Sequence, residues 1–136
     1  LKRLSEKMIA MVEDHGMKFF LRDADNILEA ECVIIIGTRE KAQMLNCGYC
    51  GFPKCVDRPF GVPCAVNTVD IGIAIGSACA TAADFRVDTR VMFSAGNAAQ
   101  QLGWLSDCIN IFAIPVSASS KNPFFDRKRK EEKAKE

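Results

Sequence analysis

Apolar and polar residues near the start of the chain recur with the period of a helix. Over residues 2–14 the charged residues fall on one face, and the apolar residues fall on the other at helical spacing: Leu4, Met8, Ile9, Met11 and Val12. This pattern predicts an amphipathic helix that ends near Gly16, a residue suited to a helix C-cap.

The next segments predict a strand, a short helix and a second strand. Met17–Leu21 (MKFFL) favours a strand, and Asp23 can cap a brief helix over Ala24–Ala30. Cys32–Gly37 (CVIIIG) is a continuous apolar run rich in β-branched residues, which is typical of a strand buried on both faces.

The longest apolar stretch predicts a helix over about residues 68–85, with Asn67 as its cap. Because this helix is apolar nearly all round, we expect it to be the central buried helix of the fold. Gly72, Gly76 and Ala80 stand four apart on one of its faces, although each helix glycine costs about 1 kcal/mol relative to alanine. Such a row predicts either close packing on another helix, for example across a dimer axis, or close approach of a flat cofactor.

The remaining chain predicts one more helix and a last strand. Phe85–Met92 favours a polar connection or a short edge strand, and Ser94 begins a helix over Ala95–Leu105. Ile109–Ser117 is the last strand, and Pro115 places its end at a sheet edge.

Together these elements predict an α+β fold, which could also be sorted as α/β, with a small mixed sheet around the central helix. The length of 136 residues fits one domain over residues 1–127, with a cysteine-rich metal loop over residues 45–66. We expect Phe124 and Phe125 to dock on this domain, and residues 128–136 to form a charged tail.

The net charge of +1 creates no strong field, so no nucleic-acid partner is expected. The longest apolar run, within Val69–Ala83, is predicted to be too short for a membrane span and includes Asp70. An odd number of cysteines, seven, without a regular framework of pairs favours metal binding in a reducing cytoplasm over secreted disulfides.

The candidate chemistry lies in four cysteines spaced C-x2-C-x4-C-x8-C, here called the four-cysteine array: Cys47, Cys50, Cys55 and Cys64. Glycines and prolines between them predict a flexible loop that can wrap one centre. Thiolates are soft ligands that suit an iron–sulfur cluster or a tetrahedral zinc ion. Three ligands within nine residues favour a [4Fe–4S] cluster, and a [2Fe–2S] cluster or zinc are the alternatives.

Two cationic residues lie within the loop, and three further cysteines lie outside it. Lys54 and Arg58 lie inside the loop, where they either face solvent or offset a cluster's negative charge and attract an acidic partner. Cys32, Cys79 and Cys108 are expected to be buried structural thiols.

A flavin is a second candidate cofactor. The helix starts at Asn67 and at FSAGN (residues 93–97) could present N–H groups to a flavin phosphate, although plain capping explains both. The residues that would contact the flavin are Gly72, Gly76, Arg90 and Lys121. The chain shows no Ser/His/Asp triad or dinucleotide glycine motif, so catalytic residues are unknown.

Three segments resemble the family of uncharacterised archaeal and bacterial proteins containing a ferredoxin domain. They are the array with PCAVNTVDIGIAIGSA, then VDTRVMFSAGNAA, then KNPFFDR, and the resemblance runs from about Phe19 to Arg127. It implies a cytoplasmic protein of the kind found in anaerobes, with an iron–sulfur cluster on the four-cysteine array.

A weaker resemblance links the chain to flavin-dependent nitroreductases. DIGIAIGSACATAA is similar to their central dimer helix, and IPVSASSKNPFFDR is similar to their last strand and tail. This resemblance implies a homodimer through long helices with FMN at the interface, although the arginine-rich N-terminal phosphate motif of that family is missing here.

The sequence thus predicts an iron–sulfur redox protein that passes single electrons to a partner protein, a small-molecule acceptor or a flavin in the same dimer. One alternative is a zinc-stabilised interaction module without redox chemistry. Another is an FMN-dependent oxidoreductase in which the cysteine loop is accessory. Whether the protein is an enzyme stays open, since any catalysis would belong to the cofactors.

Overall fold

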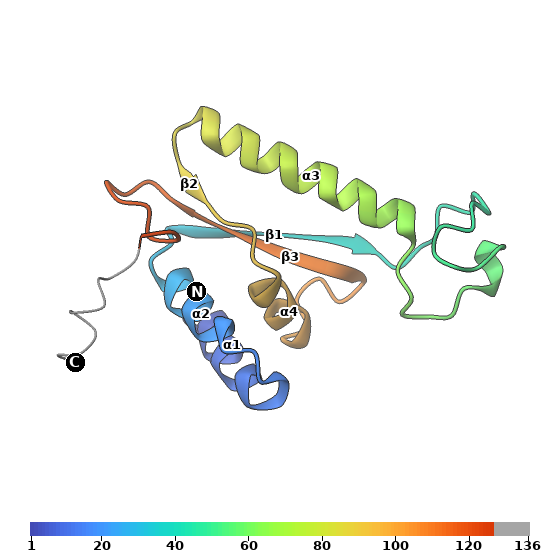
Figure 1. Cartoon of the computed structure of the whole chain (residues 1–136), viewed down its shortest axis with the longest axis horizontal. Helices are drawn as coiled ribbons and strands as arrows, with labels where there is room; N and C mark the ends of the chain where they lie inside the picture. The colour runs from blue at the N-terminus through green and yellow to red at the C-terminus, as the bar shows by residue number, and fades with distance from the viewer. Residues whose placement is uncertain (127–136) are drawn as a thin grey trace.

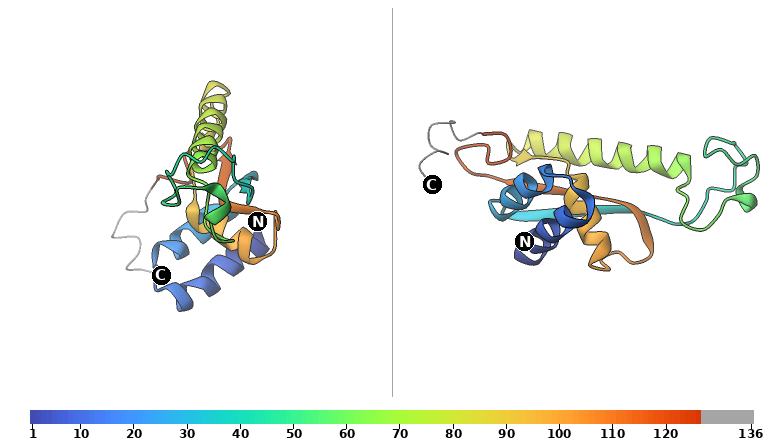
Figure 2. Two further views of the ribbon diagram at one scale, coloured as in Figure 1. Left: turned by 90° about the vertical axis from the view of Figure 1, so that its right-hand side faces the viewer. Right: turned by 60° about the horizontal axis from the view of Figure 1, so that its bottom comes forward.

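A three-stranded antiparallel sheet lies between two layers of helices in the computed structural model, which describes residues 1–126 (Figure 1). The sheet has the order β1-β3-β2, with β1 at Cys32–Arg39, β3 at Cys108–Ser117 and β2 at Asp88–Thr89. One layer holds α1 (Lys2–His15), α2 (Phe19–Leu28) and α4 (Phe93–Gln101), and the other holds α3 (Ala65–Asp84). Figure 2 shows the same two layers from other sides. The predicted α+β fold is confirmed, with a sheet whose pairings are antiparallel, not mixed.

The predicted N-terminal helix is confirmed as α1. Leu4, Met8 and Met11 are at most 1% exposed and form part of the core with α2 and α4. Gly16 ends the helix in the left-handed region at φ 64°, and its N–H donates to the Val12 carbonyl oxygen at 2.8 Å.

The strand predicted at Met17–Leu21 is wrong, because α2 already begins at Phe19. Phe20, Ala24 and Ile27 are fully buried at helical spacing, and this buried face is what holds the segment as a helix. Asp23 is therefore inside α2 and is not the cap that its residue type suggested.

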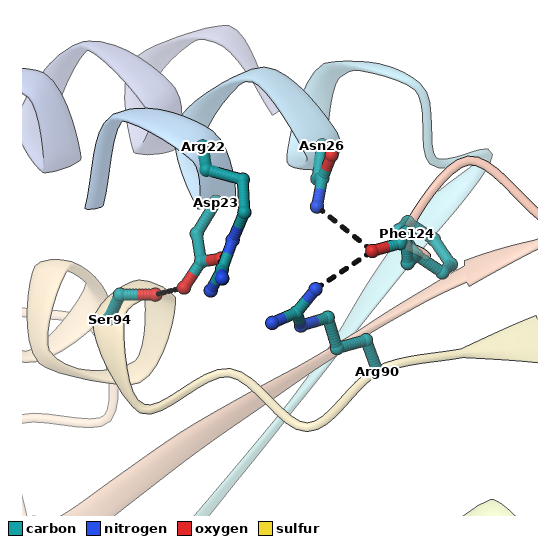
Figure 3. Close-up of polar contacts among 6 residues, drawn as sticks. All are labelled: Arg22, Asp23, Asn26, Arg90, Ser94 and Phe124. Atoms are coloured by element: carbon teal, nitrogen blue, oxygen red, sulfur yellow. Dashed lines mark hydrogen bonds and ion pairs between the residues drawn. The ribbon is translucent and has the colours of Figure 1, made fainter. Parts of the chain in front are cut away.

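The carboxylate of Asp23 instead joins two helices. It accepts a hydrogen bond of 2.6 Å from the Ser94 hydroxyl of α4 and forms an ion pair of 2.6 Å with Arg22 (Figure 3). Asp23 is 3% exposed and Ser94 is fully buried, so this hydrogen bond satisfies both groups where water is excluded.

Both predicted long strands are present, but β1 is not buried on both faces. Val33 and Ile35 pack toward α1, α2 and α4, whereas Ile34 on the opposite face is 43% exposed. The prediction that Pro115 lies at a sheet edge is also wrong, since β3 is the middle strand. The sheet tolerates this proline because the pairing of β3 with its second neighbour is interrupted there, between Thr89–Val116 and Met92–Ala113.

The prediction of a central buried helix is wrong for α3. Only Asn67 and Ile71 are buried along its 20 residues. The helix starts at Ala65 with Cys64 as its N-cap, so Asn67 lies within the first turn and is not the cap. By length and composition alone, α3 is long and apolar enough to cross a membrane, which corrects the expectation that this run is too short.

The end of the described chain docks through its backbone. Asn26 of α2 and Arg90 donate hydrogen bonds of 3.3 and 2.8 Å to the Phe124 carbonyl oxygen (Figure 3). Phe124 is fully buried as expected, whereas Phe125 is 54% exposed and lies under the Arg90 guanidinium, 5.0 Å from its ring centre.

The last predicted helix, α4, occupies Phe93–Gln101 and so begins and ends earlier than the predicted Ala95–Leu105. The short edge strand predicted after α3 is confirmed as β2. The charged tail predicted at residues 128–136 lies outside the described residues.

Candidate metal centre

The four-cysteine array lies on one long loop between β1 and α3, at residues 40–64. In Figure 1 this loop extends beyond the start of α3, away from the two helix layers. Its only regular element is η1 (Cys55–Asp57). Gly48 and Gly51 have φ values of 73° and 90°, a backbone region that glycine enters without strain, and this lets the chain turn tightly around Cys50.

The side chain of Asn46 closes the first half of the loop. Its Oδ1 accepts a hydrogen bond of 2.9 Å from the backbone N–H of Cys55, and the backbone N–H of Asn46 donates to Cys55 Sγ at 3.3 Å. These two hydrogen bonds join residue 46, next to the first cysteine of the array, to the third cysteine.

Cys64 lies at the start of α3 and is 6% exposed. The backbone N–H groups of Gln43 and Asn67 lower the pKa of its thiol below the ordinary value, and they outweigh the opposing effect of burial. The Val66 N–H and the Arg58 guanidinium also lower this pKa. The end of the loop that joins α3 therefore favours the negatively charged thiolate form of Cys64.

The side chain of Asn67 holds the incoming chain against α3. Its Nδ2 donates to the Lys41 carbonyl oxygen at 2.7 Å, and its Oδ1 accepts from Gln43 Nε2 at 2.7 Å. This clamp places the backbone of residue 43 beside Cys64. A cavity of about 570 Å³ opens next to it, between Thr38 of β1 and Asp70 of α3.

Arg58 carries buried donors that the described residues leave without an acceptor. Its Nη2 donates to the Glu40 carbonyl oxygen at 3.3 Å, but within residues 1–126 its Nε and Nη1 are buried and have no hydrogen-bond partner. A buried guanidinium whose donors have no acceptor destabilises the fold unless an anion accepts hydrogen bonds from it. This part of the loop therefore fits a negatively charged group.

The four thiols differ in exposure and are not gathered at one point. Cys47 is exposed, Cys50 and Cys55 are half-buried and Cys64 is buried. Among the described residues, no three His, Cys, Asp or Glu side chains are grouped so that they could hold a metal ion. The donor chemistry of the array fits a soft metal, and gathering the thiols requires the loop to rearrange.

The three cysteines outside the loop only partly follow the prediction. Cys79 and Cys108 are half-buried, but Cys32 is exposed at the start of β1, so its prediction as a buried structural thiol is wrong. Burial and the neighbouring Asp107 carboxylate raise the pKa of Cys108 above the ordinary value.

The residues predicted for a flavin lie on three different segments. Gly72 and Gly76 belong to α3, Arg90 follows β2 and Lys121 follows β3. One guanidinium nitrogen of Arg90 is engaged by the Phe124 carbonyl oxygen. At the start of α4, a predicted position for a flavin phosphate, the Ser94 hydroxyl donates to Asp23. A flavin at these residues stays a prediction.

The sequence prediction missed Gln43 and Asn46. Asn46 adjoins the first cysteine, and its φ of 49° is a conformation that asparagine tolerates better than most residues, so its type and position were a usable signal. Gln43 acts through its backbone N–H, for which the sequence carries no signal.

Comparison with known proteins places the chain among ferredoxin-domain sequences. Residues 60–127 match the model of a family described as uncharacterized protein containing a ferredoxin domain (DUF2148). The chain is also 36% identical over 137 residues to an uncharacterized protein of Archaeoglobus fulgidus, covering 93% of this chain and 73% of that protein. No solved structure gives a significant match. The resemblance to this family is confirmed, whereas the resemblance to nitroreductases is not. Of the array, Cys64 alone lies within the family match.

Proposed function

This chain belongs to the family of uncharacterised proteins containing a ferredoxin domain, and from that premise we propose that it is a redox protein with an iron–sulfur cluster on its four-cysteine array. The observation that carries the proposal is the charge preference at the end of the loop that joins α3. There the buried Nε and Nη1 of Arg58 have no acceptor among residues 1–126, and the pKa of the Cys64 thiol is lowered. Both features stabilise the anionic ligand set that four thiolates and a cluster form.

In this proposal the cluster ligands are the thiolates of Cys47, Cys50, Cys55 and Cys64, most simply around a [4Fe–4S] centre. When bound, the cluster supplies reversible one-electron transfer to a redox partner protein or a small-molecule acceptor. The chain contributes the sulfur ligands, and the Asn46 N–H is directed at the sulfur of Cys55. Because the thiols are apart in the chain alone, metal binding is coupled to closure of the loop.

The odd number of cysteines, seven, without a regular framework of pairs supports placing the protein in a reducing compartment, the cytoplasm, where thiolates stay available for metal. The exposed side chains of Tyr49, Val56 and Phe60 on the same loop would give a redox partner an apolar contact close to the cluster.

The proposal is tested by metal analysis of cysteine variants purified without oxygen. We expect Cys47→Ser and Cys55→Ser to lose most of the iron and sulfide that the unmodified chain binds. Cys79→Ser is the matched control, because Cys79 lies on α3 outside the loop, and it should keep both. Equal metal content in all three variants would remove the ligand assignment. Stoichiometric zinc in a colourless protein would establish the zinc-stabilised module instead.

A further inference from the structure

One side of α3 and the neighbouring sheet face carry apolar side chains that no described residue covers. Val69 and Ile73 of α3 are 61% and 66% exposed, and Ile34 on the α3 side of β1 is 43% exposed. From Ile71 to Ala83 the helix has no charged residue. A helix that faces water normally has a charged face, so this surface, here called the outer α3 surface, is unusual for a single chain.

Two sequence patterns predict that this surface is buried, whereas the single chain leaves it exposed. The apolar run of β1 is typical of a strand buried on both faces, and α3 is apolar nearly all round. In the chain alone, each element buries only one side. Both patterns are explained if another molecule buries the outer α3 surface.

No contact within the described part of the chain explains the two glycines of α3. A β-carbon built on Gly72 or on Gly76 meets no other atom within 4 Å. With Ala80 these residues form a smooth row at intervals of four along the exposed helix, and such a row lets a second helix approach closely. The spacing points to a helix as the covering element.

We propose that a second copy of this chain covers the outer α3 surface, with the two α3 helices packed against each other across a twofold axis. A twofold interface brings a surface against itself, and the stretch of α3 from Ile71 to Ala83, which has no charged residue, does so without repulsion between like charges. A helix of 20 residues is about 30 Å long and about 10 Å wide, so its outer half offers roughly 500 Å² per copy. Two copies reach the roughly 1,000 Å² that a specific interface needs.

The contacts of α3 within the chain argue against a helix surrounded by lipid. Its inner side packs on β1 and β2. Its first turn is tied to the preceding loop by the hydrogen bond of 2.7 Å from Asn67 to the Lys41 carbonyl oxygen. A helix held in this way cannot leave the sheet without losing these contacts, so a second copy is the better match to the exposed side.

The test is the mass of the anaerobically purified chain in solution, measured by light scattering and analytical ultracentrifugation. We expect twice the 15.0 kDa of one chain. Ile73→Lys should weaken the dimer roughly tenfold or more, because it places two like charges in the interface. The matched control is Leu28→Lys on α2, where Leu28 is 49% exposed in the opposite layer, and this variant should remain dimeric.

A second variant keeps the test independent of the introduced charge. A β-carbon at residue 76 meets no other atom within 4 Å among residues 1–126, so Gly76→Leu should fold as a monomer with unchanged helix content and fail to dimerise. A monomeric unmodified chain, a monomer that floats with anionic lipid vesicles, or a dimer that both variants leave intact would each overturn the proposal. Because the readout is mass, its result is independent of metal content.

Discussion

Replacing Gly96 with alanine tests the contact that joins α4 to the middle strand of the sheet. The added β-carbon would overlap the Ile111 carbonyl oxygen and lie 2.6 Å from the Phe112 Cα. In an open helix this substitution would stabilise by about 1 kcal/mol. Here the neighbours are backbone atoms of β3 that cannot rotate away, so the strain of overpacking, about 1–3 kcal/mol or more, should prevail.

We therefore expect Gly96→Ala to lower the free energy of unfolding by about 2 kcal/mol, or the Tm by roughly 8 °C for a chain of this size. Urea and thermal unfolding followed by circular dichroism would measure both quantities. Gln101→Ala is the control, because Gln101 is exposed at the end of the same helix, and this variant should keep the stability of the unmodified chain. A Gly96→Ala protein as stable as the unmodified chain would refute the described packing of α4 on β3.

Three further predictions concern single groups. Ser94→Ala removes a hydrogen bond to the buried Asp23 carboxylate and should reduce the free energy of unfolding by about 1–3 kcal/mol; unchanged stability would contradict this contact. Asp107→Asn should shift alkylation of Cys108 by iodoacetamide to lower pH, because the carboxylate contributes to the raised pKa; an identical pH profile, measured by mass spectrometry, would exclude that contribution. In the cluster-loaded protein, Arg58→Gln should lower the midpoint potential, because a positive charge that favours the reduced state is lost. The same potential in the variant and the unmodified protein would show that Arg58 does not act on the cluster.

The spacing of apolar residues correctly predicted the elements that pack against other parts of the same chain. Leu4, Met8 and Met11 identified α1, and the apolar run from Cys32 identified β1. The same reasoning failed at Met17–Leu21, because a run of five residues cannot distinguish a helix from a strand. The wider spacing from Phe20 to Ile27 does show a helical period.

The errors at α3 have a different cause. Asn67 has the residue type of a cap, but its side chain is engaged by residues 39–43, and Cys64 takes the cap position. The apolar composition predicted burial, and the single chain leaves most of α3 exposed. The pattern of apolar residues indicates that a surface is apolar, but it does not indicate whether the same chain or another molecule covers that surface.

For the candidate centre, the spacing of the cysteines identified the donor set but not its arrangement. Loop conformation here depends on left-handed residues such as Asn46 and on long-range contacts such as Gln43 with Asn67. These contacts join segments far apart in the sequence, so no local pattern encodes them.

Binding of an iron–sulfur cluster by the four-cysteine array can be measured on the unmodified chain. The protein is purified without oxygen, and a single sample is analysed for absorption, iron, acid-labile sulfide and zinc. We expect about four irons and four sulfides per chain, with a broad absorption near ~400 nm that dithionite bleaches. A colourless protein with one zinc per chain, or with neither metal, would contradict this expectation.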